Sequence, residues 1–149
     1  CIRDRDKGAP FKTLLAQMTT TVAQAKEHPG LVAQAQAVES AVMSLGTLAL
    51  HLGQASGSPN YAAAFAHAAP FLEVNGDVIL AWMHLWRADT ALKALNNKAK
   101  RKDQLFYKGL LDSARFFIET VLPVTAGKMQ SITAMSAAAV EMDEAGFGN

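Results

Sequence analysis

Residues 65–123 read FAHAAPFLEVNGDVILAWMHLWRADTALKALNNKAKRKDQLFYKGLLDSARFFIETVLP, and this stretch decides the fold. Apolar residues recur every three or four positions in both of its halves, which is typical of one face of an α-helix. The apolar pattern stops at a basic turn that holds Lys98, Lys100, Arg101 and Lys102. The stretch therefore predicts one helix from about Asn60 to Asn97 and a second that begins with Asp103 as its cap.

Two prolines predict irregularities in these helices. Proline removes a backbone donor and clashes with the preceding turn, so we expect a kink near Pro70 or a division of the helix after Ala69. Pro123 should bend the following helix in the same way. Beyond this bend the helical spacing resumes and continues to about Val140.

The N-terminal part of the chain predicts two further helices. Pro10 suits the first position of a helix that ends near Glu27, before Pro29 and Gly30. The segment from Leu31 to Gln54 repeats apolar residues in alternating steps of four and three, which is typical of a bundle seam. Because the turns are short and no strand-like alternation occurs, we expect an all-α fold, an antiparallel four-helix bundle over residues 10–140.

Composition excludes several classes of protein. The chain has 149 residues, a formal net charge of +1 and 18% charged residues, which does not suit a nucleic-acid binder. Its single cysteine, Cys1, cannot form an internal disulfide and suggests a reducing, cytoplasmic location. No apolar run approaches the roughly 18–20 residues of a transmembrane helix.

The missing initiator methionine suggests a piece of a longer polypeptide, with residues 1–9 as a lead-in and residues 141–149 as a tail.

Charged side chains on the predicted central helix form one candidate site. Glu73, Asp77 and His84 recur at helical spacing on an otherwise apolar helix, where a charge needs a partner. A carboxylate and an imidazole could serve acid–base catalysis. We favour an ion pair between helices, with Arg87 and Arg115 as the partners. Glu73, Asp77, Arg87 and Arg115 are thus structural candidates, and no catalytic, cofactor-binding or metal-binding residue is predicted.

Three other features have a structural and a functional interpretation. A di-iron bundle would need the Glu-x-x-His spacing, which the sequence lacks. The basic turn could attract a phosphate or an anionic lipid, although a solvated turn is the commoner meaning. Trp82 and Trp86, with Met83, are most simply core residues, with an indole N–H that reaches a polar partner.

Several packing motifs resemble those of a known family. They are the lead-in from Arg3 to Gly8, Ala69-Pro70-Phe71-Leu72, Phe106-Tyr107, Ala114-Arg115-Phe116-Phe117 and Val121-Leu122-Pro123. Over nearly its whole length the chain resembles the C-terminal helical domain of acyl-CoA dehydrogenases of the 3-methylmercaptopropionyl-CoA dehydrogenase type, also called the acetyl-CoA dehydrogenase C-terminal-like domain.

The resemblance implies a function for a larger enzyme. Such a parent binds FAD, oxidises an acyl-CoA thioester at its α and β carbons and passes electrons to an electron-transfer flavoprotein, as in fatty acid metabolism. The base and the flavin contacts would belong to an N-terminal dehydrogenase body, so this domain would hold no cofactor. It would act by packing on that body, by shielding the acyl-CoA cleft or by forming a homo-oligomer.

Two alternatives stay open. The chain could be a free-standing helical interaction or lipid-binding module, because its helices are amphipathic and its turn is basic. It could also be a metal-dependent bundle enzyme. If it is an accessory domain, we expect an exposed apolar patch and self-association of the isolated chain.

Overall fold

The computed structural model describes residues 8–148 and is built from helices, with no strand among these residues. The predicted all-α class is confirmed. Residues 1–7, which hold most of the expected lead-in, and Asn149 lie outside the described part. The elements are α2 (Ala9–Lys26), η1 (Pro29–Leu31), α3 (Val32–Ala55), α4 (Tyr61–Ala66), α5 (Ala68–Asn96), α6 (Arg101–Phe116), η2 (Phe117–Val121), α7 (Leu122–Ala134), α8 (Ala138–Glu141) and η3 (Glu144–Phe147).

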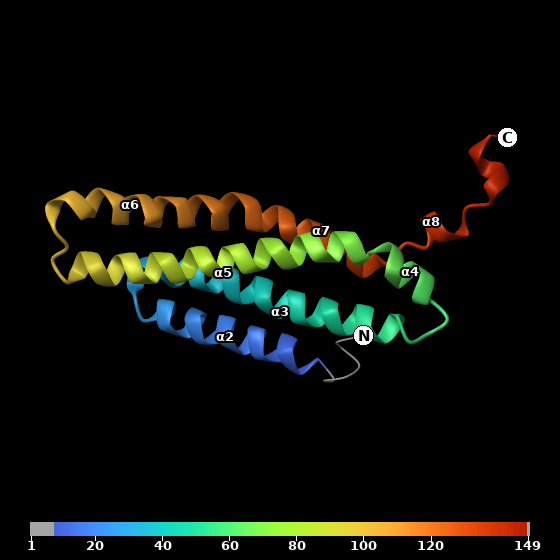
Figure 1. The fold of residues 1–149 in the computed structure, drawn as a ribbon, viewed down its shortest axis with the longest axis horizontal. Coiled ribbons are helices and arrows are strands. Elements are labelled where there is room, and N and C mark those ends of the chain that lie inside the picture. Colours follow the sequence, from blue (N-terminus) through green and yellow to red (C-terminus); the bar gives the residue numbers. More distant parts are fainter. Residues whose placement is uncertain (1–7, 149) are drawn as a thin grey trace.

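The long helices lie side by side, and each runs back along the one before it (Figure 1). α6, η2 and α7 follow one another as a single long rod. α3 and α5 contact each other, and both of them also contact α2 and α7. The central pair α3 and α5 therefore separates α2 from the rod, whereas α6 packs mainly on α5.

The core lies along the faces that α2, α3, α5 and α7 turn toward one another. Its largest fully buried side chains include Met18, Leu45, Val78, Leu85 and Ile132. Each fully buried side chain of this size stabilises the fold by roughly 1.5–3 kcal/mol. The bundle seam predicted for α3 lies in this core, with Ala35, Val38, Val42 and Leu45 buried.

The chain divides before Pro70, at a different residue from the one expected. α4 ends at Ala66 and α5 begins at Ala68, so His67 separates them and Ala69 is already helical. Pro70 falls in the first turn of α5, where a backbone N–H has no acceptor within the helix. The proline therefore starts a helix here, and α5 continues without interruption to Asn96.

A π-helical turn precedes Pro123. The N–H of Leu122 bonds to the carbonyl of Phe117, five residues back, at the end of η2. Such wide turns occur where the regular ladder of helical hydrogen bonds is disturbed, as it is by a proline that has no N–H. The helix thus continues past Pro123 into α7; the expected bend stays a prediction.

The basic turn ends earlier than predicted. Lys98 has a positive φ of 60°, which closes α5, and Lys100 is the N-cap of α6. Asp103 is not the cap, because α6 begins at Arg101 and Asp103 lies in its first turn. A carboxylate at this position still interacts favourably with the helix dipole.

The C-terminal segment leads away from the rods after Met135 (Figure 1). α8 contacts α4, and His67 Nε2 lies 3.2 Å from the carbonyl oxygen of Ser136. These contacts hold the start of the segment against the end of the bundle. η3 follows within the region that was expected to be a tail.

Candidate functional site

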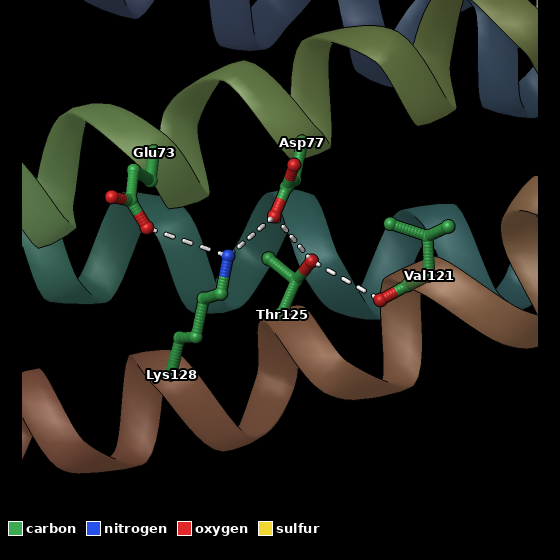
Figure 2. A network of polar contacts seen from close by, with 5 residues as sticks. All are labelled: Glu73, Asp77, Val121, Thr125 and Lys128. Atoms are coloured by element: carbon green, nitrogen blue, oxygen red, sulfur yellow. Dashed lines mark hydrogen bonds and ion pairs between the residues drawn. The ribbon is translucent and has the colours of Figure 1, made fainter.

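The two predicted carboxylates meet a lysine from α7, as Figure 2 shows. Lys128 Nζ lies 3.4 Å from Glu73 Oε2 and 3.5 Å from Asp77 Oδ2. Thr125 Oγ1 donates a hydrogen bond of 2.8 Å to Asp77 Oδ2, and its other acceptor, the Val121 carbonyl, lies at 3.3 Å. A hydroxyl has one proton, so the shorter bond to the carboxylate is the main one. The network joins α5 to α7.

The arginines expected to pair with these carboxylates lie elsewhere. Arg87 and Arg115 are exposed, and neither forms an ion pair within residues 8–148. Arg87 lies ten residues after Asp77, which at about 100° per residue turns it about 80° away around α5. Arg115 lies at the edge of a pocket formed in part by Leu85 and Leu92. The partner that the structure gives to both carboxylates is Lys128.

His84 does not join the carboxylates either. Its ring stacks on Phe117 at a centroid distance of 4.9 Å, about two turns or roughly 10 Å along α5 from Asp77. Burial lowers the pKa of His84 below its ordinary value of 6.5, and the nearby Arg87 guanidinium lowers it further. The imidazole is therefore neutral at neutral pH and packs as an aromatic ring.

A buried carboxylate that the sequence reasoning missed lies on the same helix. Asp89 is 3% exposed, and its Oδ2 accepts a 2.6 Å hydrogen bond from Lys93 Nζ. His28 Nε2 lies 3.2 Å from Asp89 Oδ1, but these two atoms do not have hydrogen-bond geometry. His28, in the turn after α2, thus lies next to Asp89 of α5. The sequence held a signal of this site, because Asp89 lies among the residues of the buried side of α5 and Lys93 follows it by four residues.

The two tryptophans differ in burial. Trp82 Nε1 donates a 2.8 Å hydrogen bond to Thr21 Oγ1, so the expected polar partner of an indole is confirmed. Trp86 stacks on Trp82, with ring centroids 6.2 Å apart, and is 48% exposed. The prediction that both belong to the core is wrong for Trp86. The reason is that α5 has more apolar surface than the neighbouring helices cover.

A surface pocket of about 270 Å³ opens between the start of α3, the middle of α5 and α6. Its walls are mostly aliphatic, and Gln34, Asp112 and Arg115 are its polar lining residues. Such walls suit the binding of an apolar group better than they suit catalysis. Among residues 8–148, no three His, Cys, Asp or Glu side chains gather in a way that could hold a metal ion.

Large apolar side chains are exposed on several helices. The most exposed are Met43, Leu50, Phe65, Leu72, Leu105, Phe106, Phe116 and Val124.

In the part of the chain that the structure describes, every helix is too short or too polar to cross a membrane.

A family model described as acetyl-CoA dehydrogenase C-terminal like matches residues 14–143. The chain belongs to this family. The resemblance of its packing motifs to the C-terminal helical domain of acyl-CoA dehydrogenases is thereby confirmed. Proteins with an acetyl-CoA dehydrogenase C-terminal-like domain are flavoprotein oxidoreductases, so the family points to chemistry of that kind.

A curated relative of this C-terminal-like domain is the broad-specificity linear acyl-CoA dehydrogenase FadE5 of Mycobacterium tuberculosis. The two are 32% identical over 77 residues, which are 52% of this chain and 13% of FadE5. The match thus spans a small part of a much longer enzyme.

Proposed function

We propose that this chain is the accessory C-terminal helical domain of an FAD-dependent acyl-CoA dehydrogenase. The observation that carries the proposal is the family match over residues 14–143. The parent enzyme removes hydrogen from the α and β carbons of an acyl-CoA thioester. In that reaction a carboxylate base of the dehydrogenase body takes the α-proton, and the flavin supplies the hydride acceptor.

The described residues do not fit FAD. The pocket of about 270 Å³ between α3, α5 and α6 is smaller than the roughly 300–1,000 Å³ of pockets that hold drug-sized ligands. Its aliphatic walls also offer few polar groups for a dinucleotide. We therefore assign FAD, acyl-CoA and the contact with an electron-transfer flavoprotein to the dehydrogenase body, and we assign no catalytic role to this domain.

The domain acts through its surfaces. Glu73 and Asp77 are engaged with Lys128, which supports a structural role for these carboxylates. The exposed apolar residues of α3, α5 and α6 suit contacts with the body, cover over the acyl-CoA cleft or contacts between subunits. A cytoplasmic location is part of the proposal and rests on the single cysteine of the sequence.

Purification of the polypeptide encoded by the whole reading frame tests the proposal. We expect a yellow protein that contains FAD and whose flavin is bleached by an acyl-CoA. The 149-residue chain by itself should bind no FAD and oxidise no acyl-CoA. A reading frame without a dehydrogenase body, or flavin bound by the isolated chain, would contradict the assignment.

One observation favours a second candidate function, which is binding to an anionic lipid surface. The basic turn of Lys98, Lys100, Arg101 and Lys102 is exposed, and the exposed Leu105 and Phe106 follow after two intervening residues. Basic and apolar residues together suit the headgroup region of a membrane. Flotation with phosphatidylserine-containing vesicles at low salt tests this function, and a chain that stays at the bottom of the gradient excludes it.

A further inference from the structure

α5 has a buried side and an outward side. Val78, Ala81 and Leu85 are fully buried on the side that faces the core. Leu72 lies nine residues before Ala81, which at about 100° per residue places it on the opposite side of the helix. In Figure 1 α5 runs across the front of the bundle, and none of the other helices drawn passes in front of it. The residues that share the side of Leu72 therefore face away from the core.

The outward side of α5 carries a repeat of apolar and small residues. Leu72, Gly76, Ile79, Met83 and Trp86 follow one another in alternating steps of four and three. A helix uses this spacing to pack along a single partner helix. Leu72 is 71% exposed and Trp86 is 48% exposed, whereas Ile79 and Met83 are half-buried. The repeat extends over about 21 Å of helix, and the described helices leave much of it open.

One edge of this side holds a charge without a partner. Leu80, which is 50% exposed, lies on that edge between Glu73 and Arg87, seven residues from each. Glu73 is already paired with Lys128 of α7. Arg87 is exposed and forms no ion pair within residues 8–148. A surface that covers this side can therefore gain a charged hydrogen bond by presenting a carboxylate to Arg87.

The outward sides of α3 and α6 are more interrupted by polar residues. On α3 the exposed Thr47 lies between the exposed Met43 and Leu50. On α6 the exposed residues include Arg101 and Lys108. A continuous exposed apolar surface marks a contact with another protein surface more strongly than scattered apolar residues do. Among these three helices, α5 is therefore the best candidate for such a contact.

We propose that the outward side of α5 is the surface on which the dehydrogenase body of the same polypeptide packs, an inference that rests on the proposed function. The segment that matches this chain is 13% of FadE5, so most of that relative lies outside the matching part. The body presents apolar side chains along the repeat of α5 and a carboxylate opposite Arg87. This assignment selects one of the exposed helices as the docking side.

Cysteine accessibility in the polypeptide encoded by the whole reading frame tests the assignment. Leu72→Cys places a thiol on the outward side of α5, and Met43→Cys on α3 is the matched control, because the two side chains are 71% and 68% exposed. We expect a maleimide to label Leu72→Cys at least about tenfold more slowly than Met43→Cys, because a covered thiol is shielded from the reagent. Leu80→Cys should be protected in the same way. Mass spectrometry of the peptides that hold the new cysteines gives each rate separately from any other cysteine.

The outcomes separate the docking side from the dehydrogenase assignment. A yellow, FAD-containing protein in which Leu72→Cys and Met43→Cys are labelled at equal rates overturns the docking side alone. Protection of Leu72→Cys that disappears when the protein is diluted would assign the side to a second copy and would also overturn the proposal. A whole reading frame without a dehydrogenase body would overturn both the docking side and the proposed function.

Charge reversal tests the carboxylate opposite Arg87. In the Leu80→Cys background, Arg87→Glu should raise the labelling rate at least about threefold, because it places a like charge against the body. Arg115→Glu on α6 is the control, since Arg115 is also exposed and forms no ion pair within residues 8–148. The control should leave the rate unchanged. Equal rates in the two variants would contradict the contact assigned to Arg87.

Discussion

Thr125 donates a hydrogen bond of 2.8 Å to Asp77, and this bond joins α7 to α5 at the edge of the core. Thr125 is 1% exposed, and the Asp77 side chain is 23% exposed. A polar pair with so little access to water depends on its partners.

Thr125→Val should therefore destabilise the fold. The substitution keeps the shape of the side chain but removes the donor to Asp77, and we expect a loss of about 1–3 kcal/mol in the free energy of unfolding. Urea unfolding measures it. Glu73→Gln is the control, because the Glu73 side chain is 65% exposed and its ion pair should contribute less than about 1 kcal/mol. Equal effects of the two substitutions would mean that burial does not set the strength of this network.

Asp89→Asn should cost more than an ordinary surface substitution. The carboxylate is 3% exposed and receives a charged hydrogen bond from Lys93. An asparagine amide can still accept from Lys93 but has no negative charge, and loss of the charged interaction should lower the free energy of unfolding by about 1.5–3 kcal/mol. Asp112→Asn, an exposed aspartate of α6, should change it by no more than about 0.5 kcal/mol. The prediction fails if the two variants unfold at the same urea concentration.

The low pKa of His84 should make stability depend on pH. Because burial and Arg87 lower this pKa in the folded chain, the unfolded chain binds the proton more readily. Above the ordinary pKa of 6.5, His84 is mostly neutral in both the folded and the unfolded chain and changes the free energy of unfolding little. As the pH falls below that value, the unfolded chain binds the proton first, and the free energy of unfolding decreases. The difference in stability between the original chain and His84→Gln should change between about pH 7.5 and pH 5. A difference that is constant over this range would contradict the assignment.

Two helical glycines should respond differently to alanine. At Gly76 an added Cβ meets nothing within 4 Å, so Gly76→Ala should stabilise the chain by up to about 1 kcal/mol through helix propensity. At Gly46 the Cβ would lie 3.3 Å from Leu15 Cδ1, where α2 approaches α3. Crowding should offset part or all of the same gain. Thermal unfolding compares them, and equal gains would show that α2 yields to the added methyl group.

The sequence predicted the long helices well because their apolar spacing and their proline and glycine boundaries are local signals. The predicted start at Pro10 and the predicted end at Gln54 each lie one residue from the observed ends of α2 and α3. The predicted division after Ala69 lies at His67 instead, because Pro70 can break a helix or begin one, and the residue alone does not say which.

The contacts between helices were harder to predict. Lys128 pairs with Glu73 and Asp77 because of the rotation and register of α7 against α5, and no local spacing encodes these. The exposure of Trp86 likewise depends on how far α2 covers α5. By contrast, the polar partner of Trp82 followed from the chemistry of a partly buried indole.

The central claim is that this chain works by packing against a dehydrogenase body that holds the chemistry. The most direct test mixes the 149-residue chain with the separately purified FAD-containing body and measures binding by calorimetry. The account predicts a stoichiometric complex in which only the body oxidises acyl-CoA and binds flavin. A body that fails to bind this chain and keeps the stability, assembly and activity of the whole enzyme would contradict the account.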